Sequence, residues 1–375
     1  MNESLLWRVL QCWLLLVLLI AGCQPEQPRI PVVLAEIPLY PGHPVEVAVN
    51  PRTGYVYITN EYGDYVFVLS ELEQIAALRT GGEKADALAV DEERGWVYVV
   101  NKGSDSVTVI RGTEVITTVE AAGREPFDVA VEPREGWAYV VSGYSKLPPR
   151  GERPAVEGNV TVISGTRIIG VVSLGQVVAK HVVVDPTSGY VYVGGFTGNI
   201  TDGFSGEVIV IQGMEEIARF EAGVSINTMD VNPRTGDVYV TGSDLKLYQF
   251  RRAELIATTQ VAEGNGSILN MCVNPITGDV YLVNKGLEVI VVRDMEVVGR
   301  ISGGRSLLRM AVDPAGNVYV ADFRTNLVTV IHNTEVITTF DVGWYPYGIG
   351  VNPANGWIYV SNTNDDTVTI LGYQE

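Results

Sequence analysis

Twelve residues are written almost identically three times in this chain: "VNPRTGYVYITN" from Val49, "VNPRTGDVYVTG" from Val231 and "VNPITGDVYLVN" from Val273. Alignment of the chain with itself extends them to eight copies of a pattern close to V-x-P-x-x-G-x-V-Y-V, although the second copy lacks the proline. Most copies recur after about 40 residues, a repeat length typical of propeller blades with four short strands. We therefore predict an all-β chain, folded as an eight-bladed β-propeller of four-stranded antiparallel blades. The central tyrosines of the copies are Tyr57, Tyr98, Tyr139, Tyr192, Tyr239, Tyr281, Tyr319 and Tyr359.

Each copy contains the same four strand segments. In the first copy they are "VEVAVN", "YVYITN", "YVFVLS" and "IAALRT", which we call strands a, b, c and d. All four are rich in β-branched and aromatic residues, as strands are. The turn between a and b accounts for the repeated words, because Asn50 can hydrogen-bond its own backbone, Pro51 fixes φ, and Gly54 accepts a positive φ. The a–b and c–d turns define one face, and the b–c and d–a loops define the other.

The last copy predicts how the ring closes. It supplies "YGIGVN", "WIYVSN" and "TVTILG" as strands a, b and c, but no strand d follows. The segment "VLAEIPL" from Val33 aligns with the strand d segment "VITTFDV" from Val336. We expect the N-terminal strand to complete the eighth blade, which would leave no exposed sheet edge.

The repeat resembles a known family. "PYGIGVNPANGWIYVSNTNDDTVTIL" from Pro346 is similar to the repeat of YVTN-type bacterial surface β-propellers, and "AVDPAGNVYVADFRTNLVTVI" from Ala311 resembles the related NHL-type repeat. The resemblance covers essentially the whole chain after the first 31 residues. It implies the propeller fold but no single function, because such blades serve binding proteins and enzymes alike.

The N-terminal residues predict export and lipid attachment. Arg8 precedes an apolar run from Val9 to Ile20, which has the length of an export signal and is too short for a spanning helix. The ending "LIAGC" resembles a bacterial lipobox, with Cys23 as the lipidated residue; a secretory signal with an incidental cysteine is the alternative. We expect a signal peptide at 1–22, a lipidated linker at 23–31 and one propeller domain at 32–375. The mature protein would be extracytoplasmic and anchored to a membrane through acyl chains.

Charge and cysteine content restrict the partners. The formal net charge of -18 would repel a phosphate backbone, so we expect no nucleic-acid partner. Of the three cysteines, Cys12 lies in the signal and Cys23 at its end, so Cys272 is expected to be a buried, unreactive thiol. The chain is expected to be a monomer.

The face of the b–c and d–a loops is the predicted binding face. Strand a should line the central channel, and one position near its start differs in every copy: Glu46, Ala87, Asp128, His181, Thr228, Asn270, Arg309 and Gly348. Two long b–c inserts, from Ser142 and from Gly194, lie on the same face, where loops on a rigid scaffold usually bind ligands. The alternative interpretation is that these polar residues have no binding role and occur there because the channel mouth is exposed to solvent. The predicted channel-mouth binding residues are Tyr40, His43, Glu46, Asp128, Lys180, His181, Asn270, Arg305, Arg309, Trp344, Tyr345 and Tyr347.

The opposite face has an arc of aromatic residues after the turn glycines. Blades 5, 6 and 7 carry Asp237, Asp279 and Asn317 at this position instead. Aromatic residues favour membrane interfaces, so the arc is predicted to rest on lipid headgroups; the alternative is that they cap the blade cores. The predicted membrane-facing arc comprises Tyr55, Trp96, Trp137, Tyr190 and Trp357.

We predict a binding or assembly module for a protein, peptide or glycan, with no cofactor. No nucleophile elbow, zinc motif or phosphate-binding loop occurs in the sequence. One enzymatic alternative remains, because some propeller hydrolases and lactonases hold a divalent metal ion at the channel mouth. Its oxygen ligands would be Glu46, Asp128, Asn227 and Asn270, with His43 or His181 as a base.

Overall fold

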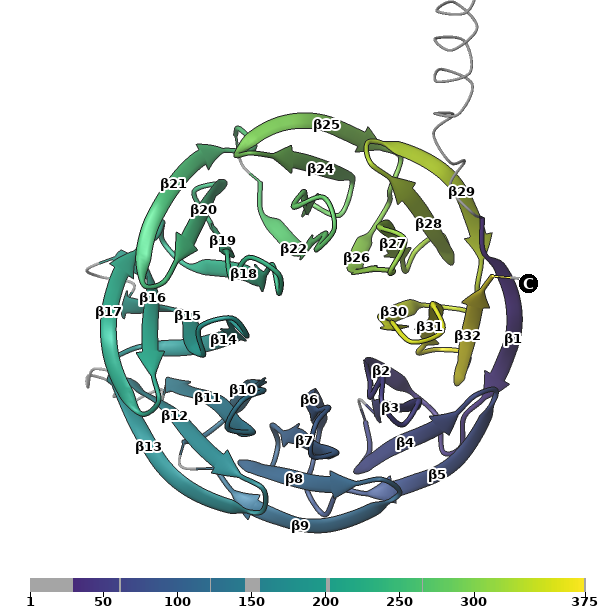
Figure 1. Ribbon diagram of the computed structural model, residues 1–375, viewed down its shortest axis with the longest axis horizontal. Coiled ribbons are helices and arrows are strands. Elements are labelled where there is room, and N and C mark those ends of the chain that lie inside the picture. Colours follow the sequence, from purple (N-terminus) through teal and green to yellow (C-terminus); the bar gives the residue numbers. More distant parts are fainter. Residues whose placement is uncertain are drawn as a thin grey trace, which may run out of the picture. The chain divides into compact units, whose positions relative to one another are not determined.

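The computed structural model shows a closed ring of eight four-stranded antiparallel sheets around a central channel (Figure 1). It describes residues 30–60, 62–121, 123–145, 156–199, 203–264 and 266–373. Pro31–Glu375 forms one compact unit. The predicted all-β, eight-bladed propeller is confirmed. The signal peptide and Cys23 lie outside the described residues.

Strand a of every blade lies innermost and lines the channel. In all eight blades its pairing with strand b shifts register near its start, as at Ala179/His181 and Ile226/Thr228. Such β-bulges re-aim side chains. The strands are β2 (Pro44–Val49), β6 (Ala85–Asp91), β10 (Pro126–Glu132), β14 (Val178–Val184), β18 (Ile226–Val231), β22 (Ile268–Val273), β26 (Leu307–Val312) and β30 (Pro346–Asn352).

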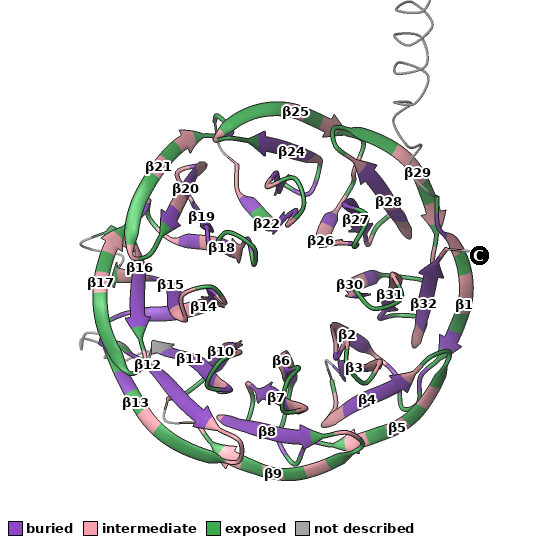
Figure 2. Cartoon of the chain, in the orientation of Figure 1, coloured by how far each residue is buried: buried purple, intermediate pink, exposed green. Residues whose placement is uncertain are grey.

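Strand b carries the repeated tyrosine, and its residues are almost completely buried (Figure 2). Seven of the eight repeat tyrosines are at most 1% exposed, since blades cover both faces of this strand. The strands are β3 (Tyr55–Asn60), β7 (Trp96–Asn101), β11 (Trp137–Ser145), β15 (Tyr190–Asn199), β19 (Val238–Gly242), β23 (Val280–Asn284), β27 (Asn317–Asp322) and β31 (Trp357–Asn362).

Strand c completes the buried layer between neighbouring blades. In blades 3 and 4 the b–c hairpin is longer than elsewhere, because the pairing continues to Ser145 with Val156 in blade 3 and to Asn199 with Gly203 in blade 4. Strand therefore extends into both flanks of the blade 3 insert. The strands are β4 (Tyr65–Ser70), β8 (Ser106–Arg111), β12 (Val156–Ser164), β16 (Gly203–Gln212), β20 (Lys246–Arg251), β24 (Glu288–Arg293), β28 (Leu327–His332) and β32 (Thr367–Gly372).

Strand d forms the outer wall of the ring. In most blades exposed and half-buried residues alternate along it, the period-2 pattern of a strand covered on one face only. Figure 2 shows this as green and pink bands on the outermost strands. The strands are β5 (Glu73–Arg79), β9 (Glu114–Glu120), β13 (Arg167–Gly175), β17 (Glu215–Glu221), β21 (Glu254–Gln260), β25 (Glu296–Ser302), β29 (Glu335–Asp341) and β1 (Val32–Pro38).

The ring closes where β1 pairs antiparallel with β32. The eighth sheet has the order β1-β32-β31-β30, so the N-terminal strand is the outer strand of the last blade. The predicted closure is confirmed.

In several blades the repeated tyrosine forms a hydrogen bond to the next blade. Tyr57 donates a hydrogen bond to the carbonyl oxygen of Gly112 at 3.0 Å, and Tyr281 donates to that of Asn333 at 2.9 Å. Both acceptors lie in the c–d turn of the following blade, as does Gly213, the acceptor of Tyr139. The repeated words therefore encode both the turn within a blade and the connection between blades.

Candidate functional site

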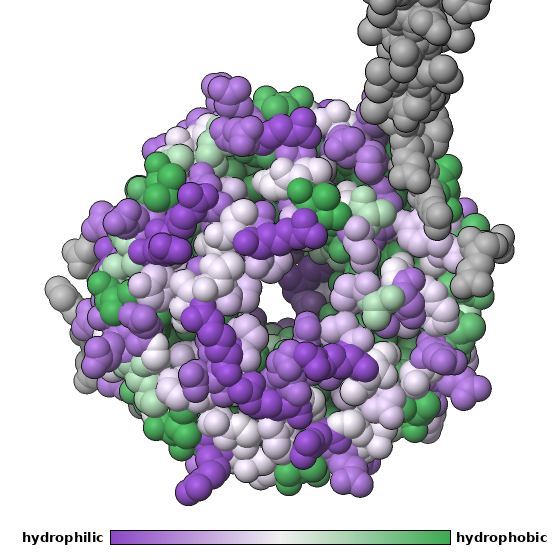
Figure 3. Space-filling model, viewed as in Figure 1, coloured by the Kyte–Doolittle hydropathy of each residue, from purple (hydrophilic) through white to green (hydrophobic). Residues whose placement is uncertain are grey.

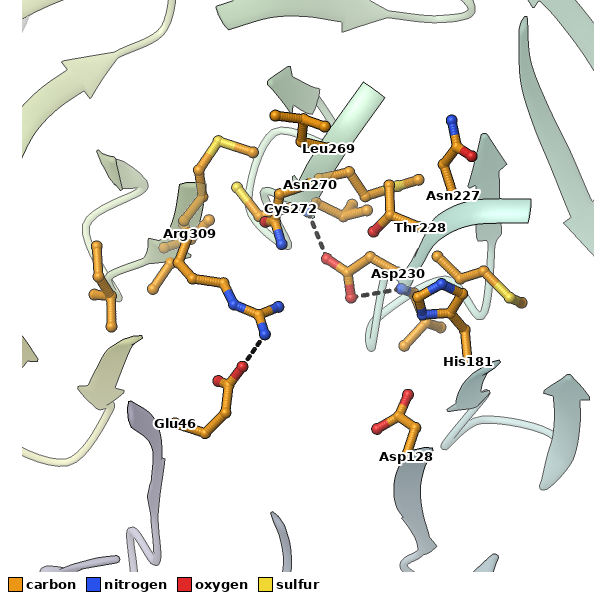
Figure 4. Close-up of a pocket in the computed structure, with 18 of the residues that line it drawn as sticks. Glu46, Asp128, His181, Asn227, Thr228, Asp230, Leu269, Asn270, Cys272 and Arg309 are labelled. Atoms are coloured by element: carbon orange, nitrogen blue, oxygen red, sulfur yellow. Dashed lines mark hydrogen bonds and ion pairs between the residues drawn. The ribbon is translucent and has the colours of Figure 1, made fainter. Parts of the chain in front are cut away.

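The central channel contains a cavity of about 610 Å³. Its opening is visible in the space-filling view of Figure 3. Of the predicted mouth residues, the cavity wall includes Glu46, Asp128, His181, Asn270 and Arg309. The register of strand a therefore places the variable ring in the channel wall, as the sequence indicates. Their order around the cavity is shown in Figure 4.

The bulges add a second set of side chains, of which sequence analysis named Lys180, Asn227 and Tyr347 and missed Phe127 and Leu269. They lie one residue before the variable ring, and Asn227 and Leu269 from this position line the cavity. The same position in blades 3 and 8 holds Phe127 and Tyr347. A strict alternation of sides predicts that these residues point away from the channel, and the bulge breaks that alternation.

Glu46 of blade 1 and Arg309 of blade 7 form an ion pair in the channel, although blade 8 lies between their blades (Figure 4). Blade 8 has Gly348 at the variable position, so no side chain separates the two groups there. The Arg309 guanidinium also lies 5.6 Å from the centre of the Tyr347 ring, a cation–π contact. Burial lowers the pKa of Arg309, and the charge of Tyr347 acts in the opposite direction.

Asp128 holds blades 3 and 4 together inside the channel wall. Its carboxylate accepts the backbone N–H of Val129 at 2.8 Å and that of Val182 in the next blade at 3.0 Å. Burial raises the pKa of Asp128 to about 7, although the two amide donors favour the charged form.

Asp230 repeats this arrangement between blades 5 and 6. It accepts the backbone N–H groups of Val231 and Val273, both at 2.8 Å, and burial raises its pKa to about 6. Sequence analysis missed Asp230. The available signal was its position two residues after the variable ring, where the other blades have only alanine, valine, cysteine or glycine.

His181 and Lys180 occupy adjacent positions in blade 4. Burial lowers the pKa of His181 to about 4, with a further contribution from Lys180, so the imidazole is neutral at pH 7. Lys180 Nζ lies 5.2 Å from the centre of the Phe196 ring and 6.0 Å from that of Phe127. Lys180 therefore belongs to a cluster of aromatic rings at the mouth.

The other predicted mouth residues lie around the rim. Trp344 is 64% exposed and Tyr40 is 85% exposed. Tyr345 packs on Phe323 with ring centres 4.7 Å apart. The rings of His43 and Tyr62 are nearly perpendicular, with centres 5.2 Å apart. The cavity wall does not include these residues or Arg305, whose backbone N–H donates to Asp322 at 2.7 Å. The predicted set thus divides into a channel group and a rim group.

One carboxylate of the metal alternative is already engaged. Glu46 is bound to Arg309, whereas the oxygens of Asp128 each accept one amide proton and keep a lone pair. Asn227 and Asn270 line the cavity with them. Within the described ranges, no three or more His, Cys, Asp or Glu side chains are grouped so that they could hold a metal ion. The geometry therefore does not favour the hydrolase alternative.

The aromatic arc lies half-buried on the face of the a–b turns. Trp96, Trp137 and Trp357 pack against the cores of their blades. Trp96 also lies 5.0 Å below the Arg111 guanidinium. Tyr55 and Tyr190 pack in the same way. At the equivalent position in blades 5 and 6, Asp237 and Asp279 form ion pairs with Arg251 and Arg293 at 2.7 and 2.6 Å.

Cys272 is a free, buried cysteine at the channel wall, and burial raises its pKa well above the ordinary value. This agrees with the expected unreactive thiol.

No helix in the described part of the chain is long and apolar enough to cross a membrane.

Comparison with solved structures agrees with the architecture. Hydrazine synthase of Kuenenia stuttgartiensis matches over 92% of this chain and 98% of its own, with 15% identity and a TM-score of 0.58. The WD40 β-propeller domain of Doa1 matches over the same shares, with 12% identity and a TM-score of 0.57. The chain is an eight-bladed β-propeller. At these identities the likeness shows the fold alone. No protein-family model and no curated protein matches the sequence.

Proposed function

We propose that this propeller is a lipid-anchored, extracytoplasmic binding or assembly module, whose channel-mouth face takes a protein, peptide or glycan. The repeat resembles that of YVTN-type surface propellers, and propeller folds commonly mediate protein interactions. The module acts as a monomer without a cofactor, and Cys23 carries its lipid anchor.

One observation carries the proposal. The frame is the same in every blade, whereas the channel mouth is different in every blade. The cavity brings acidic, basic and amide side chains together, and exposed aromatic residues lie on the rim of the same face. A cavity with a few convergent polar groups and nearby aromatic anchors is the usual form of a binding site.

An array of immobilised peptides and glycans tests the proposal. The labelled protein is applied beside a variant in which Trp344 and Tyr347 are both changed to alanine. We expect the variant to lose binding while its melting temperature changes little, because Trp344 is exposed. Trp96→Ala removes an aromatic residue from the opposite face and is the matched control. Equal binding by the double variant and the wild type contradicts the proposed site.

Attachment of the lipid is tested in cells. An alkyne-labelled fatty acid should be incorporated into the wild-type chain and not into the Cys23→Ser variant, detected by click chemistry on the purified protein. Label in the Cys23→Ser variant, or none in the wild type, contradicts the predicted anchor.

We propose that the aromatic arc rests on lipid headgroups, so that the channel mouth faces away from the membrane. Arg52, Arg94 and Arg134 lie in the turns of the same blades and support contact with anionic lipids. Residues 24–375 should float with anionic liposomes in a density gradient, and the Trp96→Ala, Trp137→Ala variant should float less. Equal flotation of the two proteins would remove the membrane role of the arc.

A further inference from the structure

The charges in the channel wall do not balance. Glu46 and Arg309 neutralise each other. His181 is neutral at pH 7, since burial lowers its pKa to about 4. Two carboxylates remain, Asp128 and Asp230, and within the described ranges no Lys, Arg or His side chain forms an ion pair with either. The wall between blades 3 and 6 is therefore negative whenever these groups are ionised.

Both carboxylates are held in place and keep acceptor capacity. Each of the four oxygens accepts one backbone N–H, from Val129 and Val182 for Asp128 and from Val231 and Val273 for Asp230. A carboxylate oxygen has two lone pairs, so each oxygen can accept a second bond from the channel side. Because the amides come from two neighbouring strands, the positions of both groups are fixed before any ligand arrives.

A second observation at the same wall points to a ligand. Thr228 lies two residues before Asp230 on β18 and is only 8% exposed, yet it lines the cavity. Its hydroxyl has no hydrogen-bond partner among the described residues. Buried polar groups are normally satisfied, so this hydroxyl oxygen is available to accept a hydrogen bond from a bound molecule.

We propose that the channel between blades 3 and 6 binds one organic cation, a primary ammonium or guanidinium group such as the side chain of lysine or arginine in a peptide partner, through Asp128, Asp230 and Thr228. This inference rests on the proposed binding function and names the ligand chemistry of that site. A metal ion would need several oxygen ligands at about 2.0–2.6 Å. An ammonium or guanidinium group is larger, and its hydrogen bonds to carboxylates span about 2.7–2.9 Å, which suits a cavity of about 610 Å³.

An anionic ligand fits this wall less well. Arg309 is engaged by Glu46 and by the Tyr347 ring. Lys180 lies over the aromatic rings of Phe127 and Phe196. Both cations are therefore already engaged, whereas the oxygens of Asp128 and Asp230 can each accept a further hydrogen bond from a ligand.

Calorimetry with a small probe tests the inference on the full chain in a non-ionic detergent and an amine-free buffer. The probe is Nα-acetyl-lysine amide, and its uncharged counterpart is Nα-acetyl-norleucine amide. We expect the lysine probe to bind at pH 8 and the norleucine probe not to bind. Asp128→Asn and Asp230→Asn should each weaken binding at least about tenfold, whereas Asp64→Asn, the same change at the surface, should leave binding unchanged. Equal binding of both probes, or no binding of the lysine probe, would overturn the inference.

The pH profile of the wild type provides a measurement that does not depend on folding of the variants. The carboxylates accept a cation only when ionised, and burial raises their pKa values to about 7 and 6. Affinity for the lysine probe should therefore increase from pH 5 to pH 8, with release of protons on binding. A flat profile over this range would also overturn the inference. Loss of array binding in the Trp344 and Tyr347 variant tests the broader function separately, because that variant leaves both carboxylates intact.

Discussion

Replacement of Tyr373 by phenylalanine should destabilise the ring at its closure more than the same change elsewhere. In blade 8, strand c (β32) and strand d (β1) come from opposite parts of the chain, so no c–d turn receives the tyrosine of blade 7. The Tyr319 hydroxyl instead donates to Asp313 at 3.0 Å and lies 3.1 Å from the Tyr373 hydroxyl. Tyr373 also donates to Asp313 and accepts from the Asn317 side-chain amide at 2.9 Å.

The expected magnitude follows from these partners. Asp313 is 1% exposed, so its carboxylate depends on protein donors. A hydrogen bond to a charged group contributes about 1.5–3 kcal/mol, and a neutral one about 1 kcal/mol. Tyr373→Phe should therefore lower the free energy of unfolding by about 2–4 kcal/mol. Tyr281→Phe, which loses one bond to a backbone carbonyl, should cost about 1 kcal/mol.

Urea unfolding followed by tryptophan fluorescence measures the difference. The midpoints are compared at a common m-value, so that a shift reports stability. Tyr62→Phe, at an exposed position, is the control and should change the free energy by less than about 0.5 kcal/mol. A Tyr373→Phe variant no less stable than Tyr281→Phe would refute the argument that the tyrosine cluster replaces the missing turn.

Three further predictions follow from the channel wall. Glu46→Gln leaves Arg309 without its counter-ion and should lower the free energy of unfolding in urea by about 1–3 kcal/mol. The loss is smaller than for a fully buried pair, because both groups are partly exposed. A further change of Arg309 to Gln should recover part of the loss, and no recovery would contradict the pairing. Gly348→Ala places a Cβ 2.1 Å from the Val45 carbonyl oxygen and should cost about 1–3 kcal/mol, seen as a lower melting temperature; an unchanged melting temperature would show that the two strands can separate. Burial raises the folded-state pKa of Asp230 to about 6, so protonation favours the folded state and this stabilisation is lost as pH rises from about 4 to 6. The free energy of unfolding of the wild type, relative to that of Asp230→Asn, should therefore decrease between pH 4 and pH 8. A constant difference over this range would contradict the raised pKa.

The fold was predictable because its determinants are local. A short turn that ends in glycine and the valine-rich strands recur in each copy, so eight copies of one pattern support the same architecture. Ring closure was predictable for the same reason: a missing strand d and an extra one at Val33 are both visible against a regular repeat. The role of Tyr281 and its counterparts was not, because their acceptors lie in the next blade, about 50 residues away.

The site was predictable only to the level of one strand position. Strand register places Glu46, Asp128 and Arg309 in the channel wall, but their partners depend on the curvature of the ring. Glu46 and Arg309 are separated by 263 residues and meet because blade 8 carries a glycine between them. Phe127 and Leu269, which lie at bulges, were missed because a register shift is set by pairing with strand b and leaves no repeated signature in strand a.

The structure separates the groups that hold the ring from the groups that distinguish its blades. The tyrosine bonds and turns lie on the a–b face and within the blades, where each copy repeats the last. The side chains that differ from blade to blade meet in the channel and on the opposite rim. Asp128 and Asp230 belong to both sets, because their oxygens connect neighbouring blades and also face the cavity. A ligand that binds these carboxylates therefore acts on the contacts between blades 3 and 4 and between blades 5 and 6, so its binding should raise the free energy of unfolding and tie the state of the channel to the stability of the ring.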